Sequence, residues 1–299
     1  MRLCLTLVLA VTAAGAERLS TLERMRPENL ARVRGDRERL ARERREIAQQ
    51  GRYRDIRAIL HCHAEDASHT GGTRAEVLAA AKKTGVGVVL LSDHVRPPRD
   101  YIEDSWRGLR EGVLFVPGSE AEGFLNYPMR SIRGENWTSR EEYISLIRRD
   151  GGLIFLSHPE ERLEHPMEQL DGLEIYNRHA DASDEAEFLK WFRKALGTAE
   201  GWKQLSRLLA EYREEFFGAQ QDYPAAVLAR WDQESQKRPL TGVAANDAHH
   251  NQVFWLTRAD EETAVIDSVE RKNLGQVRAG PGEELYRLDF DPYEVSFRN

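Results

Sequence analysis

The sequence predicts an α/β protein whose parallel sheet alternates with helices, either as an α/β barrel or as a doubly wound sheet. From residue 57 onward, short apolar runs with β character alternate with helical segments. Buried strands in this arrangement belong to parallel sheets with helical crossovers. The chain has 299 residues, 40% of them hydrophobic, which is enough for one sizeable core. One main domain with appendages is therefore expected.

The first 16 residues have the pattern of a secretory signal peptide. Arg2 precedes an apolar run from Leu3 to Ala14, and Ala14-Gly15-Ala16 offers small residues for cleavage. The run is shorter than the roughly 20 apolar residues that a membrane-spanning helix needs. We therefore expect export to the periplasm or the medium, with no transmembrane segment after cleavage.

Cysteine content and charge narrow the function classes. Cys4 lies in the expected signal peptide, so Cys62 has no partner for an internal disulfide in the mature chain. The formal net charge is −7, which argues against a general nucleic-acid-binding protein. Stability is then expected from packing and from bound metal.

Residues 17–56 form an Arg-rich extension ahead of the main domain. Its apolar positions Leu30, Val33, Leu40 and Ile47 make a narrow helical stripe among Arg and Glu. This pattern predicts a mostly solvated helix.

Residues 57–255 carry the alternating pattern of the expected main domain. A capping box of Thr73 and Glu76 opens the first helix, and Gly85 ends it. Residues 184–238 are expected to form two or three helices inserted before the final strand. Residues 256–299 are less clear, and the terminal LDFDPYEVSFRN resembles a strand without an obvious partner. The expected strands lie within 57–63, 86–94, 112–120, 152–159, 171–177 and 240–250.

Most of these strands end in polar side chains that can bind metal. The carboxyl ends of strands are where α/β barrels place their active sites. His61 and His63 share one face of their strand, while Cys62 points to the packing layer. The strand-end residues are His61 and His63, Asp93 and His94, Glu120, His158, Glu174 and Asn177, and Asp247 and His249.

Imidazoles combined with carboxylates suit Zn, Mn or Fe better than Mg or Ca. A carboxylate such as Glu120 can bridge two cations. Closely spaced cations lower the pKa of a shared water and polarise a substrate oxygen. The residue types therefore indicate metal-dependent hydrolysis.

An ordered set of short motifs resembles the polymerase and histidinol phosphatase (PHP) family of metallohydrolases over residues 57–255. The resemblance implies a distorted barrel of seven strands and helices, with two or three divalent cations at its C-terminal mouth. The motifs are HCH at 61–63, Ser68-His69, SDH at 92–94, GSE at 118–120, SHP at 157–159 and NDAH at 246–249.

The resemblance also assigns roles to these residues. One cation would be held by His61, His63, Glu120 and Asp247. Glu120 would bridge to a second cation, which His158 would also bind. Glu120 and Asp247 would be the acidic groups at the reacting centre.

The third cation would be held by His69, His94 and His249. Asp93 would assist catalysis by orienting a ligand rather than by binding metal, a task that fixes the imidazole tautomer and raises its basicity. The alternative is that Asp93 is only a turn residue.

One departure from the family pattern concerns the second cation. The family usually supplies another His between the GSE and SHP motifs, but residues 121–157 contain none. Either the cation is weakly held, or Asn126 or a water substitutes, or His179 replaces the missing ligand. The alternative for His179 is an ordinary surface residue. His165 is a weaker competitor for the role of His158.

The leading functional prediction is a phosphoesterase in which a metal-bridging hydroxide attacks phosphorus in a small-molecule or other phosphoester substrate. Loop arginines after the ligand strands could clamp phosphate: Arg96, Arg130, Arg133 and Arg178. Two alternatives stay open. One is hydrolysis of carboxylic or carbamate esters at the same site. The other, motivated by the missing His, is a non-catalytic binding protein stabilised by metal.

Overall fold

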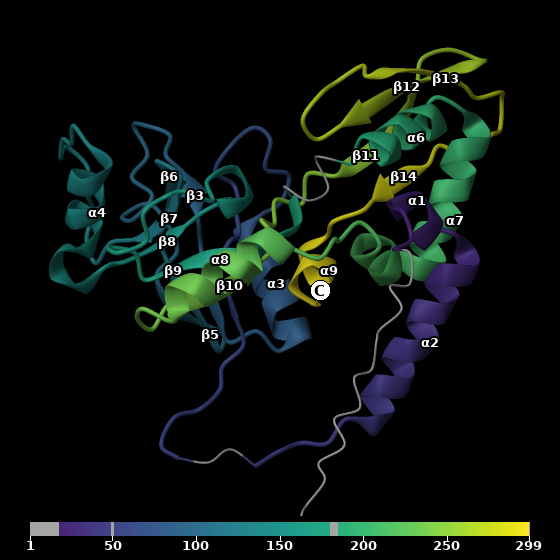
Figure 1. The fold of residues 1–299 in the computed structure, drawn as a ribbon. Coiled ribbons are helices and arrows are strands. Elements are labelled where there is room, and N and C mark those ends of the chain that lie inside the picture. The colour runs from purple at the N-terminus through teal and green to yellow at the C-terminus, as the bar shows by residue number, and fades with distance from the viewer. Residues whose placement is uncertain (1–17, 49–50, 180–184, 299) are drawn as a thin grey trace, which may run out of the picture.

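A computed structural model describes residues 18–48, 51–179 and 185–298 of the chain as a mixed α/β fold with parallel strand pairs and eight α-helices (Figure 1). The expected signal peptide lies outside these residues. Among the described helices, none is long and apolar enough to cross a membrane. Each strand expected between residues 57 and 250 contains at least one observed strand.

The first sheet contains four strands in the order β1-β2-β5-β4. The pairs β1–β2 and β2–β5 are parallel, whereas β4 runs antiparallel to β5. Val89 and Phe115 on the two central strands are buried. The strands are β1 (Ala58–Ile59), β2 (Val88–Leu90), β4 (Gly108–Arg110) and β5 (Val113–Val116).

The second sheet has six strands in the order β10-β9-β8-β7-β6-β3. All neighbouring pairs are parallel except those that β7 makes with β6 and β8, which are antiparallel. The strands are β3 (Asp93–His94), β6 (Ser119–Ala121), β7 (Phe124–Tyr127), β8 (Leu153–Leu156), β9 (Gly172–Asn177) and β10 (Thr241–Ala245).

Strand β7 was not among the expected strands. It follows β6 through a two-residue turn in which Glu122 and Gly123 both have positive φ, 56° and 84°. Two consecutive residues of this kind match the twist of a hairpin. The purely parallel alternation expected from the sequence is therefore interrupted here.

Backbone hydrogen bonds join the strands of the two sheets at their carboxyl ends. Cys62 pairs in parallel with Ala248, and the His63 N–H donates to the Ala248 carbonyl at 2.9 Å. The Ser92 N–H donates to the Cys62 carbonyl, also at 2.9 Å. The ends of β1, β2 and β10 are thereby held side by side.

Helices cover these sheets. Helix α3 (Arg74–Thr84) begins with the capping box of Thr73 and Glu76 and ends at Gly85 with φ 73°, which confirms that part of the sequence prediction. The Ser139 hydroxyl caps α4 (Arg140–Arg148). The single-turn 3-10 helices Arg149–Gly151 and Pro159–Glu161 flank β8.

Three helices precede β10, as expected for residues 184–238. They are α6 (Ala186–Leu196), α7 (Ala199–Gly218) and α8 (Ala225–Ser235). Helix α8 contacts β9. Helices α6 and α7 instead pack with a third sheet on the opposite side of the molecule (Figure 1).

The third sheet is formed between residues 253 and 289 and is antiparallel, in the order β13-β12-β11-β14. The terminal segment forms a strand only in part, because residues after Pro292 form α9 (Tyr293–Arg298), which packs on α3. The strands are β11 (Val253–Arg258), β12 (Thr263–Ser268), β13 (Gly275–Arg278) and β14 (Arg287–Asp289).

The N-terminal helices α1 (Thr21–Arg24) and α2 (Pro27–Glu43) join the same side of the molecule. Leu30 is buried in the core shared by α6, α7 and the third sheet, while Val33 and Leu40 are exposed. Helix α2 contacts α7, and Arg34 of α2 pairs with Glu215 at 3.2 Å. Helix α2 is thus solvated over most of its surface but is anchored at its start.

Candidate metal centre

Four side chains from three distant parts of the sequence meet at the carboxyl ends of the strands. The Nε2 atoms of His61 and His63 are 3.1 Å apart. Asp247 Oδ1 lies 3.0 Å from the first and 3.2 Å from the second. Glu120 Oε2 lies 3.5 Å from His61 Nε2 and 3.6 Å from His63 Nε2. All four donor atoms therefore face one point.

These separations fit a metal ion. In a tetrahedral site with bonds of about 2.0–2.1 Å, donor atoms are about 3.3–3.4 Å apart, close to the values seen here. Asp247 Oδ1 is also buried and lacks a hydrogen-bond partner. A buried carboxylate oxygen without a partner is costly unless a cation satisfies it. The group could therefore hold a divalent cation.

The donor side chains project from backbone segments at the ends of the strands. His61 and His63 project from one face, while Cys62 between them is fully buried in the core beside α3, as the alternation predicted. Asp247 and His158 both have left-handed backbones, with φ of 51° and 46°. Non-glycine residues in this conformation are uncommon and cluster at functional sites.

A second group adjoins the first through Glu120. Its Oε1 atom lies 3.0 Å from His158 Nε2 and accepts a hydrogen bond from Ser157 at 2.7 Å, while Oε2 faces His61 and His63. The two oxygens of Glu120 thus face different imidazoles, which is the geometry that a bridging carboxylate requires.

Glu174 takes part in the same group. Its Oε1 lies 2.5 Å from His61 Nδ1, and its Oε2 accepts the His158 N–H at 2.9 Å. A carboxylate at Nδ1 fixes the ring so that Nε2 faces the centre. The sequence marked Glu174 as a polar strand end but gave it no role.

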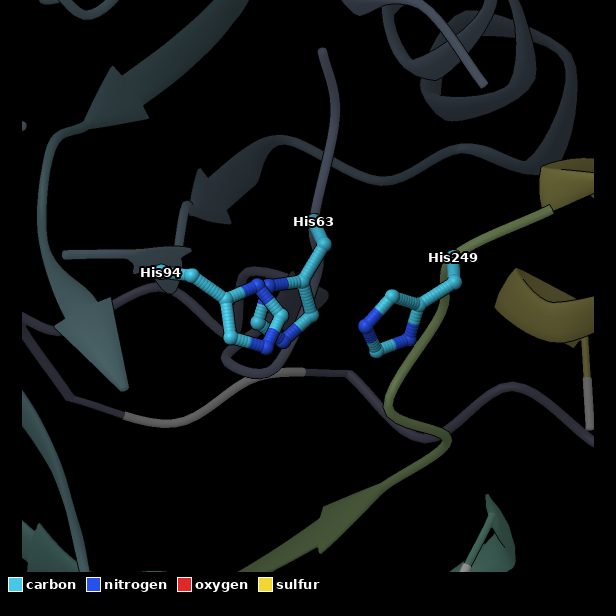
Figure 2. A group of neighbouring side chains, drawn as sticks. All are labelled: His63, His94 and His249. Atoms are coloured by element: carbon cyan, nitrogen blue, oxygen red, sulfur yellow. The ribbon is translucent and has the colours of Figure 1, made fainter. Parts of the chain in front are cut away.

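A third group consists of His63, His94 and His249, whose rings converge from three separate segments (Figure 2). The His63 ring stacks on His249 with centroids 4.0 Å apart and on His94 at 4.3 Å. The His69 ring lies 4.7 Å from His94 and 5.3 Å from His249. The three imidazoles expected for the third cation, those of His69, His94 and His249, are therefore neighbours. The His63 ring lies beside them and joins His94 and His249 in the potential ligand group.

His179 belongs to the cluster rather than to a remote surface. Its Nδ1 lies 3.2 Å from Asp247 Oδ2, and it forms a potential ligand group with Asp247 and His249. Its side chain is 39% exposed. His165 instead packs edge-on against Phe124, with ring centroids 5.2 Å apart, outside the ligand groups.

Asp66 orients two of the imidazoles, a role that was not predicted from the sequence. Its Oδ2 lies 3.0 Å from His63 Nδ1 and 2.7 Å from His94 Nδ1, and it accepts the His94 N–H at 2.8 Å. The only local signal was its place in the His-rich LHCHAEDASH stretch.

Asp93 contacts arginines rather than imidazoles, and its expected role of orienting a ligand stays a prediction. Asp93 Oδ2 accepts hydrogen bonds from Arg74 at 2.9 Å, Arg99 at 2.5 Å and Ser105 at 3.2 Å. It is fully buried in β3, so it is not a simple turn residue. Its two arginine partners make it an ion-pair centre beneath the strand ends.

The structure does not bring Asn126 to the cluster. It pairs with Ser119 in the β6–β7 hairpin, and its amide nitrogen donates to the Ser119 carbonyl at 2.9 Å. Its amide oxygen accepts from Tyr101 and Ser119. Asn126 therefore lies on the side of the hairpin opposite Glu120, because neighbouring strand residues alternate in direction.

Two of the expected phosphate arginines are engaged elsewhere. Arg130 follows β7, which runs antiparallel to β8, so Arg130 lies at the end of the sheet opposite the carboxyl ends of the parallel strands. There it pairs with Asp150 at 2.6 Å. Arg178 is buried and stands over the Phe217 ring at 4.0 Å. Arg96 and Arg133 are exposed in loops.

Comparison with protein-family models, curated proteins and solved structures found no match to this chain. The chemistry of the centre is therefore inferred from its own donor atoms.

The electrostatics of the centre show strong coupling between imidazoles and carboxylates. Burial lowers the pKa of His63, but the carboxylates of Asp247 and Asp66 outweigh burial and raise that pKa to about 9. Burial also lowers the pKa of His158, but the carboxylates of Glu120 and Glu160 outweigh burial and raise that pKa to about 10. Without a cation these imidazoles carry protons that a metal ion would displace.

The acidic members show the complementary effect. Burial raises the pKa of Asp247, but the imidazoles of His61 and His249 outweigh it and hold that pKa well below its ordinary value. His249 differs from the other imidazoles, because burial and the neighbouring His63 lower its pKa well below the usual value. A neutral imidazole is the form that binds metal.

Proposed function

We propose that this protein is an exported, metal-dependent hydrolase of the PHP type that cleaves phosphoesters. The proposal is carried by one observation: the donor atoms of His61, His63, Glu120 and Asp247 converge at tetrahedral spacing, and one of them, Asp247 Oδ1, is a buried oxygen without a hydrogen-bond partner. Its supporting context is the ordered HCH, SDH, GSE, SHP and NDAH motifs at the strand ends.

The proposal includes a distorted seven-stranded barrel. Its strands would follow the order β1, β2 with β3, β5 with β6, β7, β8, β9 and β10. The parallel bridge between Cys62 and Ala248 supports closure between the first and last strands. Strand β7, antiparallel to both neighbours, would be the source of distortion.

Bound cations would lower the pKa of a water and polarise the ester oxygen. The chain supplies the positioning. Glu120 presents one oxygen to His61 and His63 and the other to His158. Glu174 and Asp66 hold the imidazoles with Nε2 toward the centre.

His179 is proposed as the replacement for the family's missing second-site histidine. Its contact with Asp247 at 3.2 Å and its grouping with His249 support this role.

Carboxylic-ester hydrolysis is the second candidate. It is favoured by the engagement of Arg130 with Asp150 and by the burial of Arg178, which remove two of the cations expected to bind phosphate. A carbonyl substrate needs less positive charge around it than a phosphate dianion.

The test combines metal content with turnover. The full chain is stripped with a chelator, reloaded with Zn, Mn or Fe(II), and assayed for bound ions by mass spectrometry. Turnover is measured with a generic phosphodiester and a carboxylic ester. We expect at least two ions and metal-dependent turnover, with the phosphodiester preferred.

Glu120→Gln removes the bridging charge and is expected to lower turnover by at least 10³-fold while the protein stays folded. Glu122→Gln is the matched control, because Glu122 is an exposed carboxylate in the adjacent hairpin turn. Retained turnover in Glu120→Gln overturns the assignment of the site. Tightly held metal without turnover on either ester would instead favour a non-catalytic, metal-stabilised binding protein.

A further inference from the structure

A pocket of about 680 Å³ adjoins the metal centre on the side of the third sheet. His179 connects the two, because it lines the pocket and also lies 3.2 Å from Asp247 in the cluster. Helix α6 and strands β11 and β12 enclose the pocket, and these elements lie side by side in Figure 1. Its volume is within the usual range for small-molecule sites.

The floor of the pocket is aromatic. Phe192 of α6 lies edge-on to Phe254 of β11, with ring centroids 5.4 Å apart, and to Phe290 at 5.2 Å. Phe254 and Phe290 are 6.0 Å apart. Phe188 stacks on Phe192 at 5.7 Å. The rings form a preformed surface for a flat or branched apolar group.

One part of the lining is polar but uncharged. Gln220 and Gln252 both line the pocket, and Arg178 beneath them donates to their amide oxygens at 3.1 and 3.3 Å. These bonds hold the amides in place. The charged lining residues Arg193, Glu270 and Arg271 are exposed and belong to the rim.

We propose that this pocket binds an uncharged aromatic or branched apolar group on the alcohol side of the ester, next to the bond that is cleaved. The inference rests on the proposed hydrolase function. An apolar floor with a neutral polar wall stabilises such a group and disfavours a second phosphate or carboxylate, whose charge would lose hydration there, because the lining cations Arg193 and Arg271 lie at the exposed rim.

Benzyl methyl phosphate and ethyl methyl phosphate provide a direct test, because both are phosphodiesters that can release a primary alcohol and they differ mainly in the apolar size of that alcohol. Benzyl acetate and ethyl acetate form the corresponding pair for a carboxylic esterase. With metal-loaded protein, we expect kcat/KM for the benzyl ester to exceed that for the ethyl ester by at least tenfold. Equal values for both pairs would overturn the inference.

Phe254→Ala should reduce the benzyl-to-ethyl ratio by about tenfold. Trp255→Ala is the matched control, because Trp255 neighbours Phe254 on β11 but points to the other face, where Lys272 lies 4.0 Å from its ring centroid. The control should keep the wild-type ratio. A ratio that falls equally in both variants would point to general damage of the sheet and would contradict the assignment.

Binding of benzyl alcohol, measured by calorimetry on the metal-loaded full chain, separates this inference from the proposed function. If benzyl alcohol binds, Phe254→Ala weakens this binding, and no ester is turned over, the proposed pocket stands and the proposed hydrolase function is rejected. Metal-dependent turnover without a benzyl preference and without alcohol binding rejects the pocket and keeps the hydrolase. Absence of both binding and turnover rejects both.

Discussion

Carboxylates behind the imidazoles decide which nitrogen each ring presents to the centre. Glu174 fixes His61, and Asp66 fixes both His63 and His94. The side chains that could bind metal were predictable, because His, Asp and Glu follow apolar strands. Asp66 was not, since it lies in an irregular segment where neither period 2 nor period 3.6 says which way a side chain points.

Asp66→Asn is expected to weaken metal binding by about 10–100-fold, because the amide cannot hold both imidazoles in the required tautomer with the same charge. Competition with a chelating dye measures the metal dissociation constant. Asp100→Asn is a matched control, since Asp100 is a buried carboxylate that accepts backbone N–H bonds from Ile102 and Glu103 instead. Equal metal affinities for the two variants would remove Asp66 from the centre.

His179→Ala is expected to lower the number of bound ions by one, because His179 is proposed to complete the second cation's ligands. Mass spectrometry of the reloaded protein gives the stoichiometry. His165→Ala provides the control, because His165 packs against Phe124 away from the ligand groups. Wild-type stoichiometry in His179→Ala would show that the second site forms without it.

At the scale of elements, two short pieces of structure support the centre. The β6–β7 turn reverses the chain shortly after Glu120, and α9 packs on α3 behind the HCH strand. The sequence contained the Glu122-Gly123 turn, but no polar-apolar alternation identified β7 as a strand. Helix α9 is only six residues long, and its stability comes from tertiary contacts rather than from local propensity.

Tyr293→Phe tests how α9 supports the centre. The Tyr293 hydroxyl is buried and donates to the His63 carbonyl at 2.5 Å, so its loss leaves a buried acceptor with one partner fewer. The free energy of unfolding should fall by about 1–3 kcal/mol, as measured by urea denaturation. Tyr53→Phe, at an exposed tyrosine, should change little. An unaltered urea midpoint for Tyr293→Phe would show that the contact contributes nothing.

At the scale of the whole molecule, one core is assembled from three separate segments. Residues of α1 and α2, of α6 and α7, and of the third sheet bury Leu30, Trp202 and Phe290 together. The α/β class and the helices between 184 and 238 were predictable from local periodicity. This shared core was not, because Leu30 of α2 joins it from more than 150 residues before Phe188 of α6.

Metal binding and stability are expected to depend on pH in opposite directions. The folded-state pKa values of His63 and His158, about 9 and 10, exceed the unfolded value of about 6.5. Without metal, their contribution to stability is fully present below about pH 6.5 and is lost as pH rises through 9 to 10. Metal requires these imidazoles to be neutral, so its binding releases protons and tightens as pH rises.

The difference in Tm between metal-loaded and metal-free protein should therefore increase from pH 6 to pH 9. Scanning calorimetry at fixed free metal measures it. Glu120→Gln, with a weakened metal set, should show a smaller increase. A difference that stays constant over this range would mean that protonated imidazoles do not compete with metal.

The residues that could bind metal extend along the chain from His61 to His249. Tyr293, near the C-terminus, donates a hydrogen bond to the His63 carbonyl. A ribosome must therefore synthesise nearly the entire polypeptide before any ion finds all its partners. Export of an unfolded chain would delay metal selection until after translocation, and the proposed exported protein would then take its ion from the supply outside the cytoplasm. Under this proposal, protein recovered from that compartment is expected to carry a different ion from a leaderless version folded inside the cell.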